Sequence, residues 1–501
     1  MSEKKAGLLH ASERDGVNYR KANFWEIFLG MSNNGAMIAF YLLVGYASII
    51  ATEGYGIVVG IAGIILTANR VVDGAIDALI AAIFERMRVK NGKMRICMVS
   101  GWAIFSVGAL LLYNWAAGHF TGIAGFLVFL LAYNIFLFGY SLNGVAGNAI
   151  GIVLTNDPTQ RPMLSVVGTA FSYVVPLLFT NLTTFVILPK YDNQIGIPML
   201  SEATWWYIVI SGIFVAISCF GIRKVDVAET FQMLPGDEGK EDEKVTWKDM
   251  WSVLKDNRNV QMYMLAAVSD KLALMTGTQQ TIVTLMNGVL IGSYAASTMV
   301  GNFSTLVGLG FAICGGIFVA KWGAKKATTV WSWIAIGIAA ATVALCLFLG
   351  GPGGMKAIGV MGIPIIIYAV LTIGKSGAQM VLTTTAAAMK ADIVDYEYER
   401  SGKYMPAVVT GVYTFIDQLV SSFGSTIASR CLMAVGYTTA VPQLGDKATW
   451  PIFWMGMFLT FGLPVIGWIC NIIAMKFYTL DRERMIQVQK TLQERKEAHK
   501  A

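Results

Sequence analysis

Charged side chains are scarce in this sequence, and their scarcity excludes a soluble protein. Asp, Glu, Lys and Arg make up 14% of the 501 residues, while 55% are hydrophobic; a soluble domain carries about 25% charged residues. No globular interior is large enough to hide so much apolar surface. Lipid must therefore solvate much of the chain, whose length allows about twelve membrane spans of about 20 apolar residues each.

Histidine and paired cysteine are almost missing as well, which removes the usual ligands of metal enzymes. His10, His119 and His499 lie in predicted tails or loops, and no His-Glu-x-x-His motif occurs. The six cysteines are scattered singly, with no pair at a metal-ligand spacing. We therefore expect no structural metal, no cofactor, no nucleic-acid partner and no enzymatic activity.

Apolar runs long enough to cross a bilayer recur along the whole chain. They cover residues 24–50, 57–84, 95–116, 122–154, 163–188, 204–222, 259–290, 295–320, 327–350, 356–388, 406–436 and 450–478. Of the 38 Lys and Arg residues, 31 lie in the two termini and in every second connection. Because positive charge is retained on the cytoplasmic side, both termini are predicted to be cytoplasmic.

A long polar connection divides the chain into two halves. The predicted order is a cytoplasmic N-terminus (1–23), a six-helix bundle (24–222), a cytoplasmic loop (223–258), a second six-helix bundle (259–478) and a cytoplasmic C-terminal helix (479–501). In both halves an apolar helix end, at Phe84 and at Phe318, precedes a short basic turn with glycine. Two parallel six-helix repeats are the layout of the major facilitator fold, so we predict an all-α membrane protein of that class.

The second span carries ionisable groups at bilayer depth, where they are costly and usually functional. Arg70, Asp73 and Asp77 follow Asn69 at spacings i, i+3 and i+7, which share one helical face. Two carboxylates one turn apart suit Na⁺, and they suit H⁺ equally well because neighbouring carboxylates repel. The alternative is a structural Arg70–Asp73 ion pair, with Asp77 capping a polar network.

The two halves differ at this position. When Phe84 is matched to Phe318, the three charged residues of the second span fall opposite Ser304, Val307 and Phe311. The second half thus has no charge there, whereas acids that served only the fold would be expected in both halves. This asymmetry favours a single coupling site, in the first half.

Other polar or aromatic residues within the spans are candidate substrate ligands. They are Asn33, Asn34, Tyr41, Asn143, Asn148, Thr169, Tyr173, Lys375, Gln379, Asp417 and Gln418. The amides can bind the hydroxyl groups of a polar solute, or they can join helices. The tyrosines can stack on a sugar ring or serve ordinary packing. Lys375 can bind an anionic substrate group or pair with an acid such as Asp417.

Four motifs in order give the chain its resemblance to a known family. They read Arg70-x-x-Asp73-x-x-x-Asp77, Gly92-Lys93-Met-Arg95, Asn156-Asp157-Pro-Thr-Gln-Arg161-Pro162 and Ala391-Asp-Ile-Val-Asp395-Tyr396. With them the chain resembles, over nearly its whole length, the glycoside–pentoside–hexuronide:cation symporters, a branch of the major facilitator superfamily that includes melibiose permease. The resemblance implies that Asp73 and Asp77 bind the coupling cation. We expect a cytoplasmic gate from the charged residues of the motifs, Arg95, Asp157, Arg161, Asp392 and Asp395.

The sequence also departs from the family pattern. Both prolines of the second-helix region are replaced, by Ala78 and Ile96. The helix-four aspartate and the helix-five arginine with which melibiose permease binds sugar fall near Gly144 and Thr169, and its helix-eleven lysine falls at Gln418. The resemblance therefore implies a retained cation site and a different substrate site.

The predicted function is symport of a small polar solute with Na⁺ or H⁺ by alternating access. The solute is expected to be a glycoside, sugar or sugar acid such as a glucuronide, bound at mid-membrane between the halves. We expect a monomer in the cell membrane, with lipid and the solute as its partners. The alternatives are transport of an anionic amphiphile (a lysolipid or aromatic acid), a sensor without transport and, remotely, an intramembrane aspartyl enzyme that uses Asp417 as the second acid.

Overall fold

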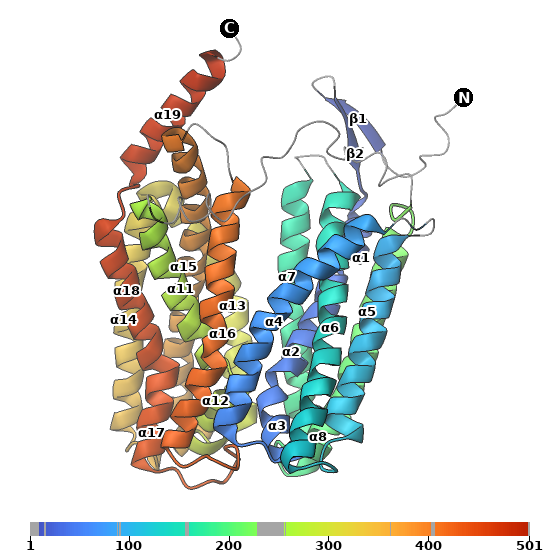
Figure 1. The fold of residues 1–501 in the computed structure, drawn as a ribbon. Helices are drawn as coiled ribbons and strands as arrows, with labels where there is room; N and C mark the ends of the chain where they lie inside the picture. The colour runs from blue at the N-terminus through green and yellow to red at the C-terminus, as the bar shows by residue number, and fades with distance from the viewer. Residues whose placement is uncertain are drawn as a thin grey trace. The chain divides into compact units, whose positions relative to one another are not determined.

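The computed structural model describes residues 10–14, 17–87, 89, 92–155, 160–227, 255, 257–360, 362–401 and 406–498. Apart from one antiparallel hairpin, β1 (His10–Arg14) with β2 (Val17–Lys21), the described chain is helical (Figure 1). It forms two compact units. The first contains the elements from β1 to α8 together with residues 439–441, and the second contains the elements from α11 to α19.

The first unit consists of the hairpin and a bundle of long helices. Its helical segments are α1 (Phe24–Met31), α2 (Asn33–Gly45), α3 (Ala47–Tyr55), α4 (Val59–Arg86), α5 (Lys93–Leu110), η1 (Leu111–Trp115), α6 (Gly122–Leu154), α7 (Arg161–Asn181), η2 (Leu182–Ile187), η3 (Leu188–Tyr191) and α8 (Ile197–Ile222). Gln160 joins the start of α7 to the start of α1, because its amide exchanges two hydrogen bonds of 2.9 Å with the backbone of Ala22.

The second unit is a bundle with a polar helix at its C-terminal end. Its segments are α11 (Arg258–Gly277), α12 (Gln280–Thr284), η4 (Leu285–Leu290), α13 (Tyr294–Trp322), α14 (Ala324–Phe348), η5 (Gly354–Gly359), α15 (Ile363–Ser401), α16 (Pro406–Ala434), α17 (Trp450–Met457), η6 (Phe458–Gly462), α18 (Leu463–Phe477) and α19 (Arg482–Ala498). The segments η1, η2, η4 and η6 are π-helical, and η3 and η5 are 3₁₀ turns.

Each of the twelve predicted spans corresponds to one helix or to a consecutive run of helices. Within the described residues, nine helical stretches are long and apolar enough to cross a bilayer. The other three predicted spans are α4, the run from α11 to η4, and α16.

Several boundaries differ from the sequence prediction; α8, for example, begins at Ile197 and not at residue 204. The first span is divided at Ser32, whose hydroxyl donates to the carbonyls of Leu29 (2.6 Å) and Phe214 (3.0 Å) and so competes with the helical ladder. The tenth span was predicted to end at residue 388, but α15 continues to Ser401. At 1.5 Å per residue α15 is about 58 Å long, so its acidic end extends well beyond a hydrocarbon core of about 30 Å.

Glycines allow α5 and α6 to pack at backbone distance. A Cβ added to Gly101 would lie 2.7 Å from the backbone nitrogen of Asn143, and one added to Gly139 would lie 2.7 Å from the carbonyl oxygen of Gly101. Small residues permit this approach between membrane helices. The contact fixes the position of α6, which carries the residues that face the charged side of α4.

Candidate functional site

The charged residues of α4 share one face, as their spacing predicts. Arg70, Asp73 and Asp77 lie within about 60° of one another around the helix, at 100° per residue. The opposite face carries exposed aliphatic side chains, namely Ile61, Ile64, Val71, Val72 and Ile83. The charged face is directed toward α2 and α6, because the neighbours of Arg70 and Asp73 come from these helices.

The two carboxylates of this face differ in environment. Asp73 is 8% exposed, and its Oδ1 accepts a hydrogen bond of 2.9 Å from the Ser141 hydroxyl on α6. Asp77 is partly exposed, has no hydrogen bond or ion pair among the described residues, and is near enough to Asp73 to repel it. The site thus has one fixed and one accessible carboxylate.

Arg70 is not locked in an ion pair in the described part of the chain. It is exposed, with its guanidinium carbon 6.0 Å from the centroid of the Tyr41 ring. Tyr133 and Tyr140 of α6 are also within electrostatic range. The alternative interpretation, a structural Arg70–Asp73 ion pair, is therefore not seen among the described residues, although the two charges attract each other.

Three residues of this site were missed from the sequence. Tyr133, Tyr140 and Ser141 lie on α6 at i, i+7 and i+8, so they occupy neighbouring faces of that helix. This spacing of hydroxyl-bearing residues is the feature of the sequence from which they could have been predicted. Asn69, predicted to belong to the cation site, is 6% exposed, and its Nδ2 has no hydrogen-bond partner.

Asn33 and Asn143, predicted as substrate ligands, instead connect helices. Asn33 is 1% exposed and donates from Nδ2 to Oδ1 of Asn143 at 2.9 Å. Asn143 is fully buried and donates in turn to the carbonyl of Met98 at 3.0 Å. These amides join α2, α5 and α6 away from solvent, which is the helix-joining role given as their alternative; their role as substrate ligands stays a prediction.

The remaining substrate candidates of the first unit are accessible. Tyr41 is 40% exposed, Asn148 and Thr169 are exposed, and Asn34 and Tyr173 are partly exposed. Asn34 lies against α7, since a Cβ on Gly168 would be 2.9 Å from its Nδ2. These five remain predictions.

In the second unit, Gln379 belongs to an internal network. Its Nε2 donates to Oδ2 of Asp270 at 2.6 Å, and its Oε1 accepts from Nε1 of Trp468 at 3.2 Å. Both ends of the amide are thus engaged across α11, α15 and α18. Gln379 is partly exposed, and its role as a substrate ligand stays a prediction.

Lys375 does not pair with an acid among the described residues. Its ammonium donates to the carbonyl of Thr460 at 3.3 Å and lies 4.6 Å from the centroid of the Phe461 ring. Asp417 interacts instead with Tyr413 and Lys271, and its Oδ1 is buried without a partner. Gln418 is exposed. Lys375 therefore retains an uncompensated positive charge.

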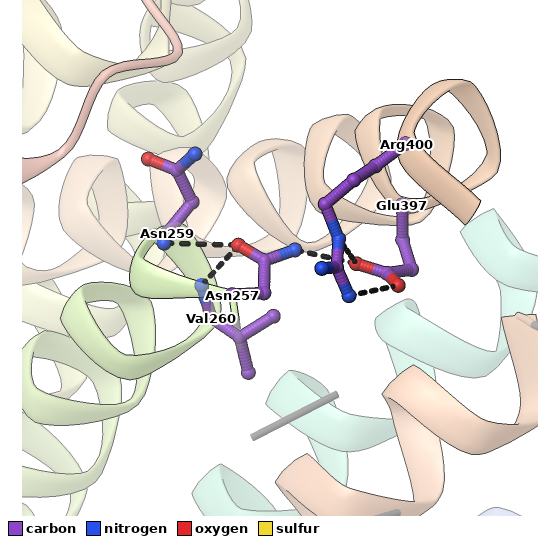
Figure 2. A network of polar contacts seen from close by, with 5 residues as sticks. All are labelled: Asn257, Asn259, Val260, Glu397 and Arg400. Atoms are coloured by element: carbon purple, nitrogen blue, oxygen red, sulfur yellow. Dashed lines mark hydrogen bonds and ion pairs between the residues drawn. The ribbon is translucent and has the colours of Figure 1, made fainter. Parts of the chain in front are cut away.

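The cytoplasmic ends of α11 and α15 are joined by a buried polar network (Figure 2). Asn257 caps α11 by accepting from the backbone nitrogens of Asn259 (3.0 Å) and Val260 (3.3 Å). It donates to Glu397 at 2.6 Å, and Arg400 holds the same carboxylate through two hydrogen bonds of 3.1 and 2.7 Å. Glu397 follows the acidic motif that ends at Tyr396, but neither it nor Asn257 was predicted as a site residue.

The predicted gate residues are engaged within their own units. Arg95 contacts the buried carboxylate of Asp226, with Nε 3.3 Å from Oδ2. Asp395 accepts from Gln489 of α19 at 2.6 Å, and Asp392 lines a pocket beside α19. Asp157 and the side chain of Arg161 lie outside the described residues. A gate formed by all five remains a prediction.

Comparison with known proteins identifies the family. The model described as MFS/sugar transport protein matches residues 28–482. The chain belongs to the MFS/sugar transport protein family. The resemblance to the glycoside–pentoside–hexuronide:cation symporters and the predicted major facilitator fold are thereby confirmed. This family member is a multi-pass membrane transporter, not an enzyme.

Relatives of this MFS/sugar transport protein occur in Escherichia coli K12. The inner membrane symporter YicJ is 23% identical over 93% of this chain and 94% of its own. YagG, named as a glycoside/cation symporter, is 22% identical over 78% of each chain, and a glucuronide carrier protein homolog is 22% identical over 94% of this chain and 96% of its own. The crystal structure of the nucleoside transporter NupG matches 91% of this chain and all of its own with a TM-score of 0.58 and 11% identity, a likeness of fold.

Proposed function

We propose that this transporter couples the movement of Na⁺ or H⁺ across the cell membrane to the uptake of a small polar solute. The observation that carries the proposal is the face of α4, where Asp73 and Asp77 lie together without a neutralising ion pair in the described chain. Two relatives named as symporters, one of them with a cation, support it.

The environments of the two acids suit reversible loading of an ion. Ser141 holds Asp73 in place, whereas Asp77 is accessible. A single positive ion between them relieves their mutual repulsion. Arg70, on the same face, contacts Tyr41 from α2, so a solute that displaces Tyr41 also changes the field at the acids. Ion and solute then favour each other's binding by the same factor.

The solute is proposed to be a glycoside, sugar or sugar acid. The exposed side chains of Asn148 and Thr169 and the partly exposed Asn34 offer hydrogen-bonding partners to hydroxyl groups. Tyr41 offers a ring face. The unpaired ammonium of Lys375 favours a solute with a carboxylate, since an uncompensated charge in a membrane protein attracts an opposite one. A relative named as a glucuronide carrier homolog agrees with this class.

Uptake into proteoliposomes tests the proposal. A panel of neutral glycosides, glucuronides, lysolipids and aromatic acids is offered with and without a Na⁺ gradient at fixed pH, and then with a pH gradient alone. Wild type should accumulate a sugar-like solute uphill under one gradient, and Asp77→Asn should abolish this accumulation. Asp192→Asn is the matched control, because Asp192 lies in a loop at a φ of 51°, which asparagine adopts readily.

Each result has a defined meaning. Full uphill transport by Asp77→Asn would refute the assigned ion site. Accumulation of lysolipids or aromatic acids in place of sugars would replace the proposed solute by an anionic amphiphile. Lys375→Gln should remove any preference for glucuronides over neutral glycosides, and an unchanged preference would exclude Lys375 from substrate recognition.

A further inference from the structure

A small cavity lies among the helices of the second unit. Its volume is about 20 Å³, and a space of about 10 to 15 Å³ suffices for one water-sized particle. The cavity lies between α11, α14, α15 and α18, and its polar lining comes from Asp270, Thr328, Thr385 and Asn471, with Tyr263 and Met389 beside them. It therefore has room for a single small ion or a single water.

Asn471 indicates that this space requires an occupant. The side chain is 3% exposed and lines the cavity, and its Oδ1 is buried without a hydrogen-bond partner. An unsatisfied buried carbonyl oxygen costs about 1 to 3 kcal/mol. A group that approaches this oxygen must bring a positive charge or a hydrogen.

The other polar groups also present acceptors. Thr385 donates its hydroxyl hydrogen to the carbonyl of Leu382 at 2.8 Å. The single hydroxyl hydrogen of Thr328 is shared between the carbonyl of Ala324 and Oγ1 of Thr385, each at 2.9 Å, so each threonine oxygen keeps at least one lone pair. Asp270 is held by Gln379, which donates to Oδ2. Among the described residues that line the cavity there is no lysine or arginine; Lys271 interacts electrostatically with Asp270 and Asp417 without being one of them.

This donor set selects one kind of ligand. Carboxylate, amide and hydroxyl oxygens suit hard cations. One carboxylate balances one positive charge, whereas a divalent ion would leave an uncompensated charge in a buried site. We propose that the second unit binds a single Na⁺ between Asp270, Asn471, Thr328 and Thr385, separate from the ion site of α4.

Binding of ²²Na⁺ to the purified full-length protein tests this site. All variants are made in a chain that carries Asp73→Asn and Asp77→Asn, which disables the site on α4. We expect this parent to bind one Na⁺ per chain and Asn471→Leu to lose it. Thr385→Val, which keeps the shape but removes one oxygen ligand, should bind about tenfold more weakly, as expected for one interaction with a charged group.

The matched control is Thr342→Val. Thr342 is as fully buried as Thr385 and likewise donates to a carbonyl of its own helix, at 2.8 Å, but it does not line the cavity. Its Na⁺ affinity should equal that of the parent. If Asn471→Leu does not fold, the Na⁺ affinities of Thr385→Val and Thr342→Val are compared instead. A weaker affinity in Thr385→Val alone supports the site, and equal affinities overturn it.

Two outcomes would overturn the proposal. If the parent binds no Na⁺, the cavity holds water only. The same conclusion follows if the parent binds Na⁺ but neither Asn471→Leu nor Thr385→Val changes its affinity. This test is independent of the proposed coupling role of Asp77. Uptake by Asp77→Asn tests the coupling role, whereas Na⁺ binding by the parent tests the site in the second unit.

Discussion

Gly92 gives the sharpest test of the cytoplasmic packing in the first unit. It has a φ of 85° directly before α5, a backbone conformation that residues with a side chain rarely adopt. An added Cβ would meet Oδ2 of Asp226 and lie 2.6 Å from Nη2 of Arg95. That carboxylate is fully buried and accepts from the backbone nitrogens of Met94 (3.2 Å) and Arg95 (2.9 Å). Gly92→Ala must therefore displace the group that caps α5.

The expected loss of stability in Gly92→Ala is the sum of a backbone cost and the cost of displacing the Asp226 carboxylate. The left-handed conformation costs alanine about 1 to 2 kcal/mol. Displacing the Asp226 carboxylate weakens hydrogen bonds to a charged group, for about another 1.5 kcal/mol. The sum, about 3 kcal/mol, should lower the melting temperature of a unit of this size by about 6 to 12 °C. Thermal unfolding of the purified protein in detergent measures this change.

A double-mutant cycle separates the two effects. In an Asp226→Ala background the carboxylate is absent, so Gly92→Ala should retain only its backbone cost, roughly half of the original effect. Arg95 loses the carboxylate contact in that background, while its Nη2 still donates to the backbone carbonyl of residue 226 at 3.2 Å. Equal temperature shifts in the two backgrounds would show that the carboxylate is not displaced and would refute the reasoning.

Two further predictions concern the packing of α6. Ser141→Ala removes the hydrogen bond that orients Asp73 and should raise the cation concentration for half-maximal uptake about tenfold; an unchanged concentration dependence in proteoliposomes would contradict this. Gly139→Ala places a methyl group 2.7 Å from the Gly101 carbonyl and should destabilise the protein by about 1 to 3 kcal/mol in thermal unfolding. Its control, Gly337→Ala, has nothing within 4 Å of the added Cβ and should be neutral or stabilising, so equal losses would show that the tight contact with α5 is not the cause.

The fold and the charged face of α4 were predictable because both depend on periodicity within one helix. Apolar runs locate the spans, and the spacing of Arg70, Asp73 and Asp77 puts them together whatever the helix packs against. The end of the tenth span was predicted at residue 388 because charged residues follow it. The prediction was wrong because α15 continues to Ser401 as a polar helix.

The partners of this face were not predictable, because they depend on how helices are aligned with one another. Ser141 reaches Asp73 from 68 positions away, and Asn143 reaches Asn33 from 110 positions away. A shift of one residue between α5 and α6 would turn Asn143 away from this pairing. Nothing in the sequence of either helix fixes that alignment, which depends on the glycine contacts between them.

The π-helical segments also bear on how chains of this kind diverge. A π turn closes its hydrogen bonds one residue later than an α turn, so it accommodates one extra residue. At η1, η2, η4 and η6 the loss of a single residue can therefore convert the segment to an ordinary helix while the inner face of the neighbouring turns keeps its orientation. Insertions and deletions of one residue among distant relatives should gather at these four stretches, within apolar spans rather than in the loops.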